Sequence, residues 1–348
     1  MYKGNRVAVV VPAYNEERFV GRTIESVPSY ADRIYAVDDG STDGTWREIQ
    51  ETARRLNEEG PEPVAADGGQ HDGSRVVCIR HETNQGVGAG IKTGYYRAID
   101  DDMDVVAVMN GDAQMDPEVL PHFLDPIVEG RADYAKGDRI SRRENVGEMS
   151  SWRLFGNRLL TRLTNLSSGY WKTIDSQNGY TAVSVETLEQ IPLEDVYDQY
   201  GFLNDMLTTL NLHDARIVNV PHRAVYGDEE SGIVYRNFVP KLSGLLFRNF
   251  LRRLARRSTD RSYQPAVAAY ALGMVGMLFG ALSALRGVSR ALRRRDDASV
   301  LRSLSGLLVS ALVFLAGAVL DRRANEHLEK GFETDAPAYD ADDHGTDE

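Results

Sequence analysis

A short polar sequence at the end of an apolar run carries the strongest chemical signal in this chain. The run Val105–Met109 is followed by Asn110, Gly111 and Asp112, with Gln114 two residues further on. Such a run is typical of a buried strand that delivers polar groups to its carboxyl end, where open α/β sheets bind ligands. Carboxylate and amide oxygens suit a hard divalent cation, which commonly binds substrate phosphates as well. The first hypothesis is therefore a metal–nucleotide site around Asp112.

Three further polar segments follow apolar runs in the same way. Residues 12–17 (PAYNEE), 38–45 (DDGSTDGT) and 84–90 (NQGVGAG) follow the first, second and third runs. Carboxylates at such positions can accept hydrogen bonds from ribose hydroxyls or a base N–H. The glycines of 84–90 allow close approach of the backbone, and we expect their amides to be able to face an anion. This segment has neither the spacing of a dinucleotide fingerprint nor the Gly-Lys-Ser/Thr of a P-loop.

The elements that must position these segments alternate between strand and helix. Strands are predicted at residues 7–11, 34–37, 76–79, 105–109 and 133–135, and helices at 17–29, 45–57, 88–100 and 117–129. This order predicts an α/β fold, a mostly parallel sheet with helices on both faces. The middle of the chain mixes helices at 152–166 and 202–212 with strands at 180–185 and 217–220. Residues 58–74 predict a long solvated loop.

Composition limits the class of protein further. The formal net charge of -12 over 348 residues argues against nucleic acid as a partner. Only six of the 40 basic residues are lysines. An acidic, arginine-rich chain fits the cytosol of a halophile or a genomic bias toward arginine codons, and the sequence leaves both open. Cys78 stands alone, which excludes an intrachain disulfide and a cysteine-based metal site. The N-terminus is too short and polar for a signal peptide, so we expect a cytoplasmic catalytic domain.

The character of the chain changes near residue 240. Lysine and arginine interleave with leucine and phenylalanine in residues 236–262, which predicts a basic amphipathic helix on a membrane surface. Residues 266–285 and 303–320 are uncharged stretches of 20 and 18 residues, and about 17–25 residues cross a bilayer. We therefore expect two membrane-associated helices within 263–325, although two buried helices of a soluble domain are the alternative. Residues 326–348 predict an acidic, disordered tail.

The loop between the two apolar stretches raises a conflict. It carries six arginines between residues 286 and 302. If both stretches cross the membrane while the catalytic domain is cytoplasmic, these arginines lie outside, against the positive-inside tendency. Re-entrant or interfacial helices would remove the conflict.

The segments 11–17, 37–45, 84–90 and 110–117 together resemble family 2 glycosyltransferases of the GT-A fold, and most closely the dolichyl-phosphate-mannose-synthase-like group. The resemblance covers about residues 5–235, so we expect residues 1–235 to form the catalytic domain. It implies a nucleotide-diphosphate sugar donor (a UDP- or GDP-sugar), a divalent metal (Mg2+ or Mn2+) and inversion at the anomeric carbon. It also implies a polyprenyl (dolichyl) phosphate acceptor at the cell membrane, with membrane lipids as further partners.

Carried over by position, the resemblance assigns residues to the donor. Pro12, Tyr14 and Glu16 would line the nucleoside pocket. Asp39 would hold the base or ribose, with Asp38 beside it.

The resemblance also assigns the metal site, and here the sequence departs from the family. Asp112 and Gln114 would address the metal and the diphosphate. Asn110 stands where the family has the first acid of its Asp-x-Asp motif. With Gly111 beside it, the Asn110 amide can still bond the sugar or ribose, but it brings no charge. Asp112 must then carry more of the metal affinity.

On the acceptor side, residues 136–139 (KGDR) resemble the Gly-Ser-Arg segment of lipid-phosphate glycosyltransferases. Arg139 would meet the acceptor phosphate and Arg153 could supply a second arm, since guanidinium groups bind phosphate bidentately. Residues 175–180 resemble an acceptor-side loop, and 226–231 a mobile loop over the donor. His222 is expected at the surface.

Asp205 lies where many members place a catalytic carboxylate. A sugar hydroxyl acceptor would need such a base, whereas a phosphate monoester, with a second pKa of about 6, would not. Three functions follow from these expectations. The first is an inverting transferase that acts on polyprenyl phosphate. The alternatives are a transferase that acts on a sugar hydroxyl of a lipid-linked glycan, and an inactive nucleotide-sugar-binding scaffold. The sequence leaves the oligomeric state open.

Overall fold

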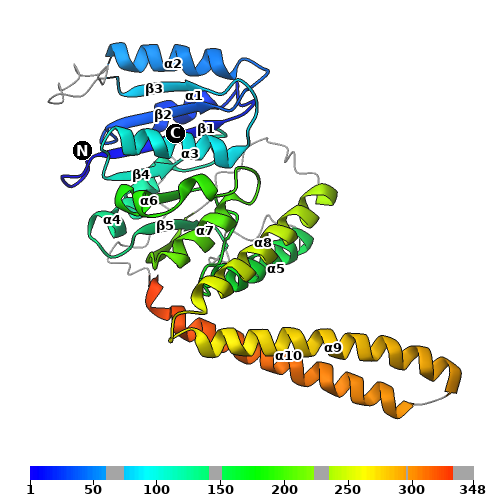
Figure 1. Ribbon diagram of the computed structural model, residues 1–348. Coiled ribbons are helices and arrows are strands. Elements are labelled where there is room, and N and C mark those ends of the chain that lie inside the picture. The colour runs from blue at the N-terminus through cyan, green and yellow to red at the C-terminus, as the bar shows by residue number, and fades with distance from the viewer. Residues whose placement is uncertain (60–73, 141–150, 223–234, 295–296, 332–348) are drawn as a thin grey trace, which may run out of the picture.

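The structure is a computed structural model that describes residues 1–59, 74–140, 151–222, 235–294 and 297–331. Most of the predicted loop at 58–74, the proposed donor loop at 226–231 and the chain from 332 lie outside the described residues. The described residues form a layered α/β domain from which a long helical hairpin projects (Figure 1).

Eight strands of the described chain form one sheet, in the order β3-β2-β1-β4-β6-β5-β7-β8. They are β1 (Val7–Ala13), β2 (Arg33–Asp38), β3 (Val76–Arg80), β4 (Val105–Val108), β5 (Tyr134–Asp138), β6 (Thr181–Ser184), β7 (Ile217–Pro221) and β8 (Glu329–Lys330). Only β6 runs antiparallel to its neighbours β4 and β5. The predicted mostly parallel sheet is confirmed. The central strand β1 is buried along its whole length, as expected of a strand covered on both faces.

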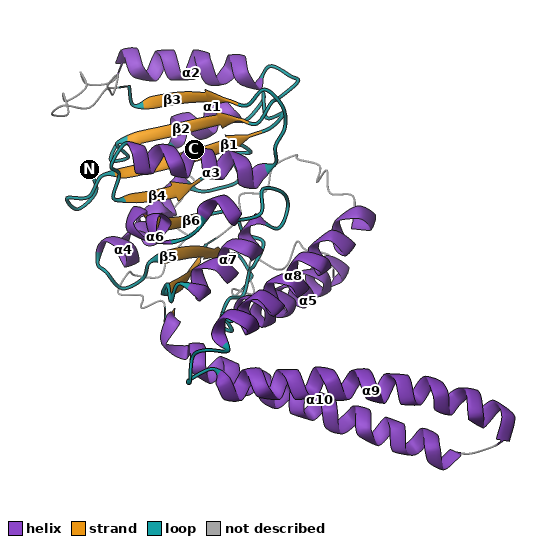
Figure 2. Cartoon of the chain, viewed as in Figure 1, coloured by secondary structure: helices purple, strands orange, loops and turns teal. Residues whose placement is uncertain are grey.

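Helices cover both faces of the sheet (Figure 2). One core includes side chains of α1 (Val20–Ser26), α2 (Thr45–Glu59) and α4 (Leu120–Val128). The other includes side chains of α3 (Val87–Asp100), α6 (Val185–Gln190) and α7 (Phe202–Leu212). The predicted helix at 117–129 begins as a short 3-10 turn, Pro117–Val119, because Asp116 caps it by accepting the N–H of Glu118. Apart from this division, the elements predicted within residues 1–222 match the structure to within three residues, whereas the basic helix predicted over 236–262 ends at Arg257.

Two helices pack beside this domain, α5 (Ser151–Ser168) and α8 (Tyr235–Arg257). The basic residues of α8 divide between two surroundings. Arg252, Arg253 and Arg257 turn inward and pair with Asp205, Asp321 and Asp214. The exposed basic residues in this region are Lys241, Arg248, Arg256 and Arg261. Only part of the basic charge is therefore available to a membrane surface.

The last two helices, α9 (Gln264–Arg294) and α10 (Asp297–Asn325), form the hairpin (Figure 1). A Cβ atom on Gly273 would lie 2.8 Å from the backbone of Phe314, so glycine permits the close approach of the two helices. Residues Gln264–Arg286 and Leu301–Leu328 are long and apolar enough to cross a membrane. Only 17% and 6% of their apolar windows are buried, so the alternative of two core helices in a soluble domain is wrong.

The chain returns to the sheet after the hairpin. The sequence predicts a disordered tail from residue 326, but Leu328 is buried and Glu329–Lys330 form β8 beside β7. The open edge of β7 offers backbone hydrogen-bond partners to residues 329–330. The acidic composition of the tail gives no sign of this pairing in the sequence. The hairpin is therefore an insertion between two strands of one sheet.

Candidate active site

The carboxyl ends of β1, β2 and β4 meet at one edge of the sheet. The N–H of Asp39 donates to the carbonyl of Ala13 at 2.9 Å, and the N–H of Gly111 donates to the carbonyl of Pro12 at 3.1 Å. A Cβ on Gly111 would lie 3.0 Å from that of Ala13, so glycine allows this approach. The structure therefore brings together the strand-end segments that the sequence singles out.

Side chains from other elements hold the turn after β4. Ala113 adopts a left-handed conformation (φ 56°), and its N–H donates to the hydroxyl of Thr23 at 3.1 Å. The hydroxyl of Tyr180 donates to the carbonyl of Asp116 at 3.1 Å. Asn110 packs against Gly179, where a Cβ would lie 2.9 Å from the Asn110 amide nitrogen. The turn that presents Asp112 is thus fixed on both sides.

Asp112 lies half-buried in this turn, and its Oδ1 accepts the N–H of Gln114 at 3.1 Å. Burial raises the pKa of Asp112, and the charge of Arg139 opposes that rise. A carboxylate in this state lacks enough positive charge around it, so a bound cation would stabilise its ionised form.

The donor atoms at Asp112 fit one hard cation held largely by its substrate. No cluster of three or more His, Cys, Asp or Glu residues within the described chain could hold a metal. One carboxylate, with the amide oxygen of Gln114, supplies only part of a coordination shell. Mg2+ and similar ions are commonly held by one or two carboxylates, with water and substrate phosphate as the other ligands. The residues present therefore fit a metal that arrives with a diphosphate.

The structure gives Asp39 an internal task. Its Oδ1 accepts the N–H of Gln85 at 2.9 Å, and its Oδ2 accepts the N–H of Gly86 at 2.8 Å. A ring nitrogen of His81 lies 2.7 Å from the same carboxylate. Asp38 is fully buried, accepts the N–H of Ser41 and pairs with Arg80. Contact of Asp38 or Asp39 with a base or ribose stays a prediction.

The expectation that the amides of residues 84–90 face an anion is wrong for the first turn of α3. The N–H groups of Gly88 and Ala89 donate to the carbonyl of Asp198, at 2.7 and 3.2 Å. Lys92 of α3 pairs with the Asp198 carboxylate at 2.6 Å. The glycines allow the segment 84–90 to pack closely against the loop around Asp198, rather than against a ligand. The partner lies about a hundred residues away in the sequence, so local spacing could not reveal it.

Three other residues assigned to the nucleoside lie at the end of β1, Pro12, and in the loop that follows it, Tyr14 and Glu16. Pro12 is buried, Glu16 is half-buried, and the ring of Tyr14 is 44% exposed. The N–H of Glu16 donates to the hydroxyl of Thr45 at 2.8 Å, which ties this loop to the start of α2. The exposed Tyr14 ring is thus held next to the segment that follows β2.

On the acceptor side, Arg139 is held by a buried carboxylate. Its Nε and Nη2 donate to the two oxygens of Asp175, at 2.8 and 3.3 Å. Burial alone would raise the pKa of Asp175, but the charge and hydrogen bonds of Arg139 and the charge of Lys136 lower it. Asn110, two residues before Asp112, packs against Gly179, four residues after Asp175, so the turn after β4 and the loop that holds Arg139 are neighbours. Arg153 lies on α5, and its side chain is outside the described residues.

Asp205 lies on α7, apart from this cluster of contacts. It is fully buried; Oδ1 accepts from Arg252 at 2.9 Å and Oδ2 from the N–H of Tyr197 at 2.9 Å. Arg248 lies 3.6 Å from Oδ2. These contacts describe an ion pair between two helices. A catalytic role for Asp205 stays a prediction.

Sequence reasoning missed two buried groups near Arg139. Lys136 is fully buried, and its Nζ donates to the carbonyl of Asn178 at 2.8 Å. His222, expected at the surface, is 5% exposed and lies 2.6 Å from the amide of Asn178. For Lys136, the available sequence signal was a lysine that directly follows Tyr134 and Ala135 in the predicted strand region.

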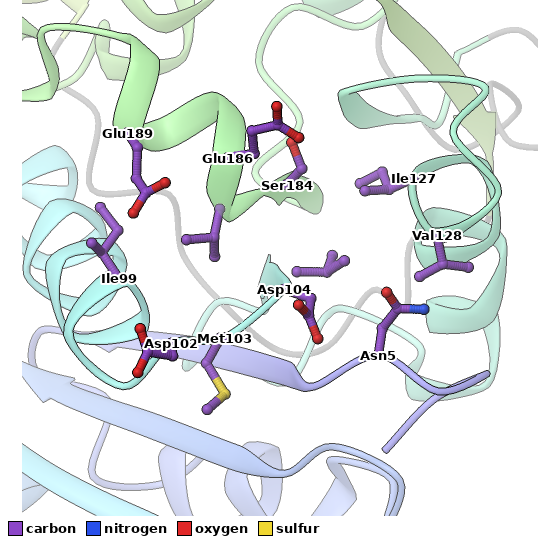
Figure 3. A pocket seen from close by; sticks show the side chains of 12 residues that line it. Asn5, Ile99, Asp102, Met103, Asp104, Ile127, Val128, Ser184, Glu186 and Glu189 are labelled. Atoms are coloured by element: carbon purple, nitrogen blue, oxygen red, sulfur yellow. The ribbon is translucent and has the colours of Figure 1, made fainter. Parts of the chain in front are cut away.

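A cavity of about 450 Å3 lies at the opposite, amino end of β4 (Figure 3). Four acidic side chains are among those that line it: Asp102, Asp104, Glu186 and Glu189. Their charge opposes a diphosphate. This cavity is therefore separate from the strand-end site.

The fold and the site define an α/β protein with a half-buried carboxylate, Asp112, and an anchored arginine, Arg139, at the carboxyl edge of its sheet. Residues 8–191, more than half of the chain, match the family model described as Glycosyl transferase family 2. The chain belongs to this family, and it is a glycosyltransferase. The resemblance found in the sequence and the expected GT-A type of fold are confirmed.

Curated relatives are similar over the same part of the chain. The UDP-N-acetylglucosamine--dolichyl-phosphate N-acetylglucosaminyltransferase of Methanococcus voltae is 27% identical over 221 residues, covering 63% of this chain and 86% of that protein. The undecaprenyl-phosphate mannosyltransferase of Micrococcus luteus is 27% identical over 226 residues, covering 62% and 82%. The dolichol-phosphate mannosyltransferase of Pyrococcus furiosus is 25% identical over 221 residues, covering 62% and 55%.

Among solved structures, glucosyl-3-phosphoglycerate synthase from Mycobacterium tuberculosis in complex with Mn2+, UDP and phosphoglyceric acid is similar in fold. Its TM-score is 0.49 at 19% identity, and the match covers 72% of this chain and 78% of that one.

Proposed function

We propose that this protein is an inverting glycosyltransferase that moves a sugar from a UDP- or GDP-sugar to the phosphate of a polyprenyl (dolichyl) lipid at the membrane surface. The observation that carries the proposal is Arg139, held by the buried Asp175 of the loop that packs, at Gly179, against Asn110 of the turn that presents Asp112. An anchored guanidinium beside a cation-binding carboxylate provides for two phosphate groups, one on the donor and one on the acceptor. Lipid-phosphate acceptors in the names of the relatives support the same assignment.

The donor would be held at the edge formed by β1, β2 and β4. Asp112 and Gln114 would hold a divalent metal, which when bound neutralises the charge that develops on the leaving diphosphate. The exposed ring of Tyr14 and the backbone around Pro12 border the space for the nucleoside. The fixed turn of residues 110–116 keeps Asp112 in one position during the reaction.

The acceptor end needs a cation and no general base. Asp175 fixes the orientation of the Arg139 guanidinium, which would bind the lipid phosphate. That phosphate is already largely dianionic near neutral pH, because its second pKa is about 6. Both oxygens of Asp205 are engaged by Arg252 and by a backbone N–H. A sugar hydroxyl would require a base, so this engagement favours a phosphate acceptor.

Exposed apolar side chains support a membrane location. Leu159 and Leu163 of α5 and Phe247 and Leu251 of α8 are 41–59% exposed. Exposed arginines accompany them on both helices: Arg158, Arg162, Arg248 and Arg256. Leucine and phenylalanine among arginines are typical of helices at the interface of a bilayer. We infer that α5, α8 and the hairpin together associate the enzyme with the cell membrane, with the catalytic domain on the cytoplasmic side.

The test is a donor screen with the full chain in detergent. Polyprenyl phosphate and Mn2+ or Mg2+ are supplied with each UDP- or GDP-sugar in turn, and products are identified by mass. We expect one glycolipid, formed from the phosphate but not from the matched polyprenol. Arg139→Gln should weaken use of the lipid while leaving donor binding intact.

Other outcomes would contradict the proposal. Transfer to the hydroxyl of a lipid-linked sugar, with none to polyprenyl phosphate, would favour the second function. Binding of a nucleotide sugar without any turnover would favour an inactive scaffold, the hypothesis that Asn110 suggests because it brings no charge.

A further inference from the structure

Lys136 is a buried cation in β5, the strand that ends directly before Arg139. It is fully buried in β5, and its Nζ donates to the carbonyl of Asn178 at 2.8 Å. No carboxylate of the described residues forms an ion pair with it. The next residues toward the amino end of the strand, Tyr134 and Ala135, belong to the two apolar cores. An apolar side chain would therefore be the ordinary choice at this position.

The charge of Lys136 is costly where it lies. Burial, with a contribution from the charge of Arg139, lowers its pKa to about 8, while the charges of Asp175 and Asp138 oppose the shift. Buried charges are retained mainly where they are paired or serve a function. Lys136 forms no ion pair within the described residues, so a function of its contacts is expected.

The ammonium of Lys136 holds one end of the acceptor-side loop, residues 175–178. Arg139 holds the other end through Asp175. Within the loop, the N–H of Asn178 donates to the carbonyl of Asp175 at 3.4 Å. Lys136 of β5 and Arg139, directly after β5, thus fix the two ends of the loop that orients the Arg139 guanidinium.

The same loop reaches the other side of the site. The amide of Asn178 contacts His222 at the end of β7, and the next residue, Gly179, packs against Asn110. We therefore expect a change at Lys136 to reach Arg139 through the loop and Asp175, while the Asn110 side chain lies against Gly179, directly after the loop.

We propose that Lys136 is a positioning residue for the acceptor phosphate: it fixes the loop 175–178 that orients Arg139, and it adds a buried positive charge beneath the phosphate. This inference rests on the proposed lipid-phosphate acceptor. The groups that face Lys136 are Asp175 from the loop, Asp138 and Arg139 from its own strand and, through Asn178, His222 from β7.

The proposal has a definite pH dependence. A phosphate dianion bound at Arg139 favours the protonated ammonium, so it raises the pKa of Lys136. Binding is then strongest below the pKa of the unliganded enzyme, near 8, and weakens as pH rises through that value. Arginine at this position stays charged throughout this range.

The experiment compares Lys136→Arg and Lys136→Met with the wild type, using the full chain in detergent. KM for polyprenyl phosphate and KM for the donor sugar are measured from pH 6.5 to 9.5. At pH 7 we expect Lys136→Met to raise the lipid KM about tenfold, the size of one lost charge-assisted contact, with donor KM within about twofold. The wild-type lipid KM should rise above pH 8, and Lys136→Arg should abolish that rise.

A thermal melt separates positioning from a structural role. Because Lys136→Met removes a costly buried charge but also the hydrogen bond to Asn178 and a charge that faces Asp175, it should leave the melting temperature at pH 7 close to that of the wild type while it weakens lipid use. Lys92→Met is the matched control. Lys92 is also a nearly buried lysine that donates to a loop carbonyl, that of Val196, but it lies on α3 away from Arg139. It should leave the lipid KM unchanged.

Three results would overturn the inference. One is a lipid KM of Lys136→Met within twofold of wild type at pH 7. Another is a rise above pH 8 that persists in Lys136→Arg, a comparison that remains available if Lys136→Met does not fold. The third, a wild type that transfers sugar to no lipid phosphate, would remove the proposed function as well.

Discussion

Asp112 and Asn110 illustrate how one charge would set the properties of the proposed metal site. The turn after β4 holds an amide at position 110 and one carboxylate, Asp112, whose pKa burial raises. Protons and metal ions compete for such a group. As pH falls, cation binding should therefore be lost at a higher pH than at an aspartate with an ordinary pKa. The remaining coordination must come from Gln114, water and the donor diphosphate.

This arrangement predicts opposite effects for two substitutions in one turn. Asp112→Asn should abolish measurable Mn2+ binding in the presence of UDP or GDP and lower turnover by about 10²–10³, the effect of losing one charge-stabilising group. Asn110→Asp, which adds the second acid, should tighten Mn2+ binding about tenfold, because close opposite charges strengthen the interaction. Titration calorimetry with Mn2+ and each nucleotide provides the measurement. Equal Mn2+ affinity in all three proteins would exclude this turn as the metal site.

Single residues also show where sequence reasoning ends. Asp112 and Asp39 could be selected because they follow apolar runs, a local pattern, and Arg139 through the resemblance of residues 136–139 to a family segment. The partners of these residues are distant in sequence: Gln85 and Gly86 for Asp39, and Asp175 for Arg139. Spacing identifies the groups at the edge of the sheet. It does not show which of them are already engaged by the protein itself.

At the scale of elements, α7 and α8 are joined by the charge of Asp205. Its carboxylate is fully buried and bonded to Arg252 of α8. Removing one partner of a buried pair leaves the other charge without compensation and costs about 3–5 kcal/mol. The contact therefore holds the basic helix to the catalytic domain.

Asp205→Asn should accordingly lower stability by that order while turnover with a phosphate acceptor falls less than tenfold in the folded protein. Chemical denaturation and steady-state rates on the same preparation measure both effects. Arg252→Met, which removes the other partner, should behave similarly. A loss of turnover of a thousandfold at unchanged stability would instead identify Asp205 as a catalytic base and favour a hydroxyl acceptor.

Elements with a strong period were predictable, and those defined by a distant partner were not. Apolar runs located β1 to β4, and helical spacing located α7 to the residue. β8 is two residues long and exists because β7 leaves an open edge beside it. The inward arginines of α8 were predicted to face lipid, since a helical pattern of charges does not show which side meets another domain.

At the scale of the whole molecule, the hairpin is anchored only at its base. Arg253 of α8 binds both oxygens of Asp321 of α10 at 2.7 Å, and both side chains are 1% exposed. Asn211 of α7 donates to Asn325 at 2.7 Å. From this base each arm extends about 20 apolar residues, roughly 30 Å, the thickness of the hydrocarbon core.

The arrangement predicts that the hairpin crosses the membrane twice and that its arginine-rich tip lies on the side opposite the catalytic domain. Six exposed basic residues flank the base, against six arginines at the tip, so the charge bias does not oppose this orientation: Lys241, Arg248, Arg256, Arg261, Arg322 and Arg323. A cysteine introduced at the tip, Ser289→Cys, should react with a membrane-impermeant maleimide from that opposite side alone.

Cys78→Ser is the background for this measurement. Cys78 is partly buried and burial raises its pKa, so it is itself a slow target. Labelling of Ser289→Cys only from the side of the catalytic domain would contradict the double crossing and indicate re-entrant or interfacial helices.

The position of β8 has a consequence for biogenesis. Because its two residues follow the hairpin in the chain, a ribosome releases them only after both arms have been made. The last edge of the sheet can then close only when those arms have turned back toward the catalytic domain. Completion of the sheet therefore follows synthesis of the whole hairpin, and until then the edge of β7 is uncovered.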